Sequence, residues 1–183
     1  MKRTLLITAL LSSFAFTACK NDKKTDTSDS ESTLSEKEMT SEEESTTIIK
    51  NMDLAFKTDE NNQLAMVYFD LKNALVKADA KSATEAAELM MKNLQEKNQL
   101  RLAEEIAKNE GDIEVQRRAF YKLSDLLAPV FSRNITSGKL YKQYCPMAFN
   151  NEGAFWFSQE KEIMNPYFGD KMLHCGSIKE TIE

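Results

Sequence analysis

Five residues in the C-terminal part of this sequence have side chains suited to binding soft metal ions. Cys145 and Met147 stand two positions apart, and Met172, His174 and Cys175 fall within one short stretch. Thiolate, thioether and imidazole ligands select Cu(I) or Ag(I), and to a lesser degree Zn(II), over hard cations. These residue types therefore indicate a soft-metal site.

Simpler roles for the same residues stay open. Cys145 and Cys175 can form a disulfide, which is a common use of two cysteines in an oxidising compartment. The methionines and Trp156 can fill a small core, and His174 can be an exposed polar residue. The sequence has no CxxC or HxxxH pair, so spacing alone does not decide between a disulfide, a core and a metal site.

The segment that contains these residues predicts a β-hairpin. Residues 141–149 and 154–157 carry alternating aromatic side chains on either side of the turn residues 150–153. A hairpin around this loop would pair Phe149 with Ala154, Met147 with Trp156 and Cys145 with Ser158. Trp156 would then lie over a cation held at Met147.

Residues 171–175 are expected to form a third extended piece of this small sheet. In an extended chain, Met172 and His174 would point to one side and Cys175 to the other. All five sulfur and imidazole ligands would therefore need a local turn in order to bind one ion.

Apolar residues at helical spacing predict the scaffold upstream of this segment. A first helix should end near Ala78, a second should begin at a possible capping box at Ser82, and a third should stop at the turn 109–111. Asp112 can cap a longer fourth helix, and Pro129 should kink or loosen the last turn of that helix. The predicted fold is mainly α, an antiparallel three- to four-helix up-and-down bundle with a small C-terminal β-hairpin or irregular segment.

The first residues, MKRTLLITALLSSFAFTAC, have the order of a secretory signal. A basic start precedes an apolar run that is too short to span a membrane, and small residues stand just before Cys19. This ending resembles a bacterial lipoprotein box, in which Cys19 would carry lipid and anchor the mature chain to a membrane. The prediction is a signal peptide over residues 1–18 and a cell-envelope lipoprotein that faces the periplasm or the surface. An ordinary secreted protein is the alternative.

The predicted tether covers residues 19–60, and its run from residue 20 to residue 50 is rich in Lys, Asp, Thr, Ser and Glu, with no aromatic and almost no aliphatic side chain. Such a composition cannot bury enough apolar surface to offset the entropy of ordering, so a disordered acidic tether is expected. The folded domain is then predicted over residues 61–183, with the Cys, Met and Trp segment at about 140–178. The net charge is −5, and the acidic excess is concentrated in this tether. Nucleic-acid binding requires a basic face, so nucleic acid is not an expected partner.

An enzyme is not expected from the residues present. The chain has one histidine, five glycines and no glycine-rich phosphate loop, which leaves little from which to build a catalytic triad or a nucleotide site. The helical carboxylates lack the Glu-x-x-His pair of a di-iron bundle and are expected on solvated faces.

Two strings carry a resemblance to a known family. The helix DIEVQRRAFYKLSDLL and the segment YKQYCPMAFNNEGAFWFSQEKEIMNPYFGDKMLHCG resemble a bacterial periplasmic family called domain of unknown function 3347, over almost all of residues 64–178. The residues that match its pattern in the second string are Cys145, Pro146, Met147, Trp156, Asn165, Pro166, Tyr167, Gly169, Met172, Leu173, Cys175 and Gly176. His174 is an addition to that pattern.

The resemblance implies a helical lipoprotein. Some versions of the family are similar to parts attached to the periplasmic adaptors of copper and silver efflux pumps, which favours heavy-metal handling by analogy of context. The expected function is binding or buffering of Cu(I) or Ag(I) for an efflux or trafficking partner, for example a pump adaptor. The alternative is a non-catalytic structural or interaction module whose C-terminal segment is closed by a Cys145–Cys175 disulfide.

Overall fold

The computed structural model describes residues 53–183. The predicted signal peptide, Cys19 and the tether up to residue 52 lie outside the described residues. None of the helices in the described part has the length and apolar character that crossing a membrane requires.

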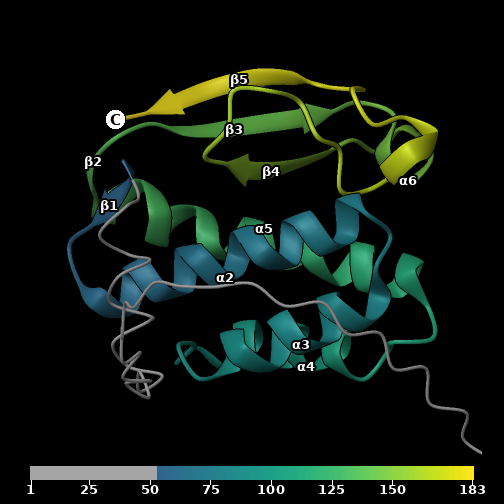
Figure 1. The fold of residues 1–183 in the computed structure, drawn as a ribbon, viewed down its shortest axis with the longest axis horizontal. Helices are drawn as coiled ribbons and strands as arrows, with labels where there is room; N and C mark the ends of the chain where they lie inside the picture. Colours follow the sequence, from purple (N-terminus) through teal and green to yellow (C-terminus); the bar gives the residue numbers. More distant parts are fainter. Residues whose placement is uncertain (1–52) are drawn as a thin grey trace, which may run out of the picture. The chain divides into compact units, whose positions relative to one another are not determined.

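Four helices form an antiparallel bundle (Figure 1). They are α2 (Asp59–Val76), α3 (Ala80–Met91), α4 (Lys97–Ala107) and α5 (Ile113–Asn134). Each helix packs against the next, and α2 also packs against α5. Short connections between amphipathic helices favour this arrangement. The predicted mainly α bundle with a C-terminal β segment is confirmed.

Side-chain caps start three of these helices. Asp112 accepts hydrogen bonds from the backbone N–H groups of Glu114 and Val115, as expected for the fourth helix. The second helix differs from the prediction, because Asp79 rather than Ser82 is its cap. The Asp79 carboxylate accepts both the amide N–H and the hydroxyl of Ser82, at 3.0 and 2.7 Å. An aspartate in that position satisfies the free N–H groups of the first turn.

The folded chain includes residues that precede the predicted start at residue 61. Strand β1 (Ala55–Phe56) pairs with β2 (Ile135–Ser137), which directly follows α5. Leu54 and Phe56 are buried in the core. Helix α5 continues past Pro129 to its end, so the proline does not interrupt the approach to β2.

A three-stranded antiparallel sheet packs beside the bundle. Its strands are β3 (Leu140–Cys145), β4 (Ala154–Ser158) and β5 (Ser177–Ile182), in the order β4-β3-β5. In Figure 1, β4 lies nearest the helices and β5 farthest from them. The pairing of β3 with β5 shifts between Lys142 and Gln143, which leaves Lys179 as the extra residue of a β-bulge.

The predicted hairpin register is wrong. Ala154 pairs with Cys145 rather than with Phe149, and Trp156 pairs with Gln143 rather than with Met147. The loop is longer than expected because Phe149, Asn150 and Asn151 adopt left-handed φ angles of 53, 61 and 70° within the short helical turn α6 (Ala148–Asn151). Met147 therefore lies in the loop and not on a strand.

The third strand also differs from the prediction. Residues 171–175 are not extended, because the 3-10 turn η1 (Gly169–Lys171) and further turns occupy this stretch. The strand that completes the sheet is β5, which begins just after Gly176.

Aromatic side chains form the core between the sheet and the helices. The ring centroid of Phe131 lies 5.2 Å from that of Tyr68 and 5.5 Å from that of Phe157. The Tyr68 hydroxyl contacts the Ser124 hydroxyl at 2.7 Å and accepts the backbone N–H of Phe157 at 3.1 Å. An edge strand has backbone N–H groups that no neighbouring strand accepts. Here the Tyr68 hydroxyl accepts such an N–H group, and this bond joins the inner edge of the sheet to α2.

Candidate functional site

Cys145 and Cys175 face each other at the end of the sheet where β3 finishes and β5 begins. Their sulfur atoms lie 3.1 Å apart. Both are free thiols, Cys145 buried and Cys175 partly buried. The hydrogen bond to Cys145, together with burial, raises the pKa of the Cys175 thiol. The sequence-predicted cysteines are therefore brought together, although they lie 30 positions apart in the chain.

The segment before Cys175 has its own polar framework. The Asn165 side-chain amide donates to the Cys175 carbonyl at 2.8 Å, and the Asn165 backbone N–H donates to the Leu173 carbonyl at 2.8 Å. Arg117 from α5 donates to the Pro166 carbonyl at 2.9 Å and to the Leu75 carbonyl at 3.1 Å. These bonds hold the second cysteine in position against the bundle.

The other three predicted ligands do not join the cysteine pair in one cluster. His174 is exposed, and its Nδ1 lies 2.9 Å from the Ile163 carbonyl. Met147 and Met172 line a separate cavity of about 470 Å³. Among residues 53–183, no three His, Cys, Asp or Glu side chains are placed to hold a metal ion.

The left-handed turn at residues 149–151 contributes to the cavity that Met147 and Met172 line. Phe149 packs its ring against Tyr121 and Tyr167, at centroid distances of 5.5 and 5.2 Å, and the Arg118 guanidinium lies 4.3 Å from its centroid. Met147 is left 47% exposed at the rim. A thioether and aromatic faces therefore meet the solvent here.

Trp156 is fully buried and does not lie across from Met147. Its ring packs edge-on against Tyr167, with the two centroids 5.8 Å apart. The predicted cation–aromatic contact between Trp156 and an ion held at Met147 rested on the wrong register and is not supported by this placement.

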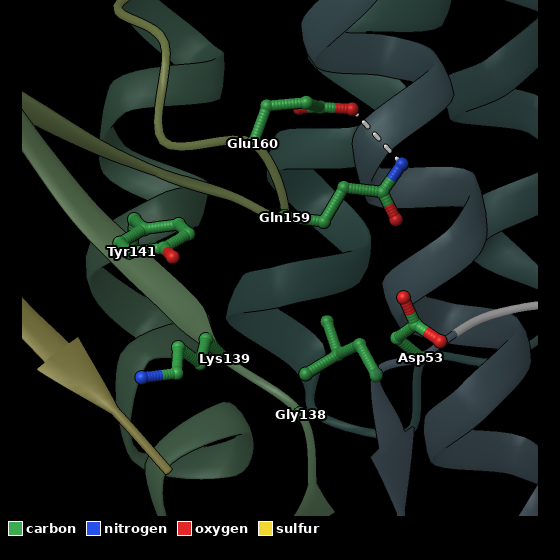
Figure 2. A pocket seen from close by; sticks show the side chains of 7 residues that line it. Asp53, Gly138, Lys139, Tyr141, Gln159 and Glu160 are labelled. Atoms are coloured by element: carbon green, nitrogen blue, oxygen red, sulfur yellow. Dashed lines mark hydrogen bonds between the residues drawn. The ribbon is translucent and has the colours of Figure 1, made fainter.

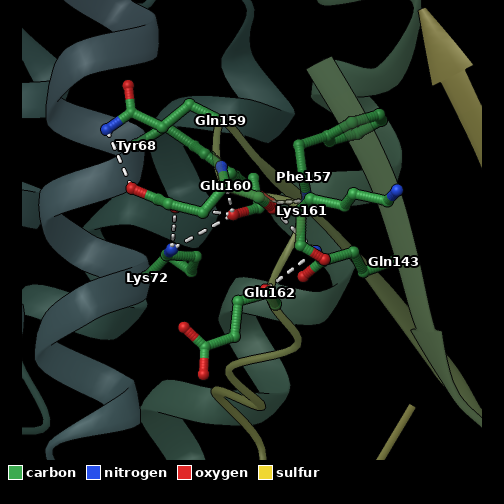
Figure 3. A network of polar contacts seen from close by, with 9 residues as sticks. Tyr68, Lys72, Gln143, Phe157, Gln159, Glu160, Lys161 and Glu162 are labelled. Atoms are coloured by element: carbon green, nitrogen blue, oxygen red, sulfur yellow. Dashed lines mark hydrogen bonds and ion pairs between the residues drawn. The ribbon is translucent and has the colours of Figure 1, made fainter. Parts of the chain in front are cut away.

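Sequence reasoning missed a buried polar network between α2 and the segment after β4 (Figure 3). The Lys72 side chain is 2% exposed, and its Nζ lies 3.1 Å from Oε2 of Glu160. Ser158 donates its hydroxyl to the same carboxylate oxygen at 2.7 Å. Partial burial of Glu160 opposes ionisation, but the Ser158 bond and the Lys72 charge outweigh it and hold the pKa of Glu160 at about 2.

A surface cavity of about 630 Å³ adjoins this network (Figure 2). Asp53 and Glu160 contribute carboxylates to its lining, and Tyr141 contributes a phenol. Lys139 also lines it, but its ammonium group forms an ion pair with Glu183 at 2.7 Å. The lining of the cavity therefore carries charges of both signs.

The described residues define a helical-bundle domain with an attached three-stranded sheet. The family model described as "Protein of unknown function (DUF3347)" matches residues 64–138, so this region is similar to that family. This confirms the resemblance over the region from α2 to β2. The cysteine pair and the sheet lie beyond the matched residues. No curated protein and no solved structure matches the chain.

Proposed function

We propose that this protein is a non-catalytic interaction module of the cell envelope whose C-terminal segment is closed by a disulfide between Cys145 and Cys175. The 3.1 Å contact between the two sulfur atoms carries the proposal. The predicted lipid anchor at Cys19 lies outside the described residues and is part of the same proposal, as is the membrane as a partner.

The covalent step is an ordinary thiol–disulfide exchange. The two thiols lose two protons and two electrons and form one S–S bond. The electrons pass to a disulfide of an envelope thiol oxidase, whose own bond is reduced to two thiols. Because the pair joins the end of β3 to a residue two positions before β5, the bond would fasten the segment 159–176 to the sheet.

The polar network supports a non-catalytic role. Lys72 lies 3.4 Å from the Ser158 hydroxyl, which is the residue combination of a Ser–Lys nucleophile. Its ammonium group is paired with the ionised Glu160, however, and the Ser158 proton is directed to that carboxylate. A protonated lysine cannot accept the proton of a serine nucleophile.

Thiol counting tests the disulfide. The full chain carrying Cys19→Ser retains two cysteines and is isolated from an oxidising envelope under denaturing, thiol-blocking conditions. We expect no free thiol before reduction and two after it. A chain with both thiols free in that compartment would refute the disulfide and with it this form of the proposal.

Soft-metal binding is a second candidate, and one observation favours it. Met147 and Met172 line one cavity, and each is close in sequence to a member of the cysteine pair. Four sulfur donors thus come from two neighbouring segments, which is a donor set suited to Cu(I) or Ag(I). Such binding requires that Cys145 and Cys175 are reduced. The bound ion would then be passed to an efflux adaptor or a similar envelope protein.

Metal titration separates the two candidates. Reduced protein is titrated with Cu(I) against a competing chelator, alongside the Met147→Leu and Met172→Leu variants. Metal binding predicts retention by the parent chain and a weaker affinity in both variants. Met91→Leu, on α3, serves as the matched control and should behave as the parent. No retention by the reduced parent chain would exclude the metal candidate.

A further inference from the structure

Two buried polar atoms on neighbouring strands lack a hydrogen-bond partner. Within residues 53–183, the side-chain carbonyl Oε1 of Gln143 and the indole Nε1 of Trp156 contact no protein donor or acceptor. Both side chains are fully buried. A buried polar atom without a hydrogen bond lowers the stability of the fold by about 1–3 kcal/mol. We therefore expect each of the two atoms to have a hydrogen-bond partner.

The two atoms are chemically complementary and close in the fold. Gln143 and Trp156 are directly paired residues of β3 and β4, so their side chains share one face of the sheet. An amide oxygen only accepts hydrogen bonds and an indole nitrogen only donates them. The third unpaired buried atom in this part of the chain, Oε1 of Gln116, lies on α5 and has no such partner beside it.

The chain after β4 covers this face. The Gln143 amide nitrogen donates to the carbonyl oxygens of Glu160, Lys161 and Glu162, at 2.9, 3.4 and 3.1 Å, and Figure 3 shows the amide turned toward this segment. The far edge of the Trp156 ring and the Ile163 side chain both reach the space beside Gly176. The Gln143 amide group therefore lies against residues 160–162, and the Trp156 ring on the same face of the sheet reaches the neighbourhood of Ile163.

We propose that one buried water molecule bridges Trp156 and Gln143. The water accepts the indole N–H of Trp156 and donates one hydrogen to Oε1 of Gln143. Its second hydrogen meets a carbonyl oxygen of residues 160–162, each of which retains a free lone pair. A buried water of this kind makes about three hydrogen bonds. It adds a link between β3, β4 and the covering segment to the one that the Gln143 amide nitrogen already makes.

Nuclear magnetic resonance can test this because the chain has one tryptophan, so its indole N–H resonance is unambiguous. In full-length protein carrying Cys19→Ser, we expect a cross-peak between this proton and a long-lived water, with the sign of dipolar contact rather than proton exchange. No water cross-peak, or a crystal structure with a direct Nε1–Oε1 hydrogen bond, would overturn the proposal.

A variant adds a second readout. Gln143→Met removes the acceptor and keeps the size of the side chain, so the indole resonance should remain while its water cross-peak is lost. An undiminished water cross-peak in this variant would overturn the bridge. If the variant does not fold, the measurement on the parent chain still decides the question.

Discussion

Lys72 and Glu160 form an unequal pair, because the lysine is buried and the carboxylate is 46% exposed. We predict that Glu160→Gln lowers the free energy of unfolding by about 2–4 kcal/mol, since it leaves a buried charge without a counter-ion. Lys72→Met should lower it by about 1 kcal/mol or less, because an apolar chain suits the site and water can solvate Glu160. Chemical denaturation measures both. A larger loss for Lys72→Met would contradict this account.

The Glu160 carboxylate should also shape the acid stability of the protein. Its pKa is about 2 in the folded state against a usual 4.5, so the unfolded chain binds a proton first as the pH falls. This contribution to stability is complete above pH 4.5 and is lost progressively down to about pH 2. Thermal unfolding from pH 6 to pH 2 should therefore show a flatter decline in Glu160→Gln than in the parent chain. Identical slopes would exclude the effect.

Residue-scale signals explain what the sequence could reveal about the site. The cysteine pair was predictable because only Cys145 and Cys175 remain once Cys19 is assigned to lipid. Lys72 stands four positions after the buried Tyr68, and helical spacing puts residues so separated on the same face of the helix. Its partner lies 88 positions away, and no local pattern indicates that a carboxylate will meet it.

At the scale of elements, the helices were predictable because their apolar spacing and their caps are local in sequence. The hairpin register was not. It depends on Phe149 adopting a left-handed conformation, which bulky residues avoid. The packing of its ring against Tyr121 and Tyr167 stabilises that turn. This is a tertiary effect that turn propensities do not contain.

Gly153 is the last residue of this turn, and a substitution there tests the geometry of the turn. It has φ of 80°, and an added Cβ would collide with the Tyr144 hydroxyl. Gly153→Ala should therefore lower the free energy of unfolding by about 1–3 kcal/mol. Gly111→Ala is the matched control, because nothing lies within 4 Å of its added Cβ. Equal stability of the two variants in urea would show that the turn is not constrained.

At the scale of the whole molecule, the pairings that join distant parts of the chain escaped prediction. Strand β1 precedes the four bundle helices in the chain and pairs with β2, which follows them. Strand β5 pairs with β3 rather than with β4. Short strands carry little periodic signal, and their partners are chosen by the surface that the bundle presents. The bundle itself follows from local helices and short connections.

Closure of the Cys145–Cys175 bond should stabilise the whole domain. A cross-link between residues 30 positions apart restricts the unfolded chain and adds about 3–4 kcal/mol to the free energy of unfolding. Reductant should therefore lower the melting temperature of the parent chain. The double variant Cys145→Ser, Cys175→Ser should melt at a temperature that reductant does not change. Insensitivity of the parent chain would contradict a closed bond.

The bulge at Lys179 has a consequence for how copies of this domain behave when crowded. A regular free strand is a template on which another chain can add, and this is a route to fibrils. The outer edge of β5 is interrupted at Lys179 and carries the exposed charge of Glu180 beside it. An incoming strand would meet an irregular, charged edge, so we expect the β5 side of the sheet to resist edge-to-edge association at high local concentration.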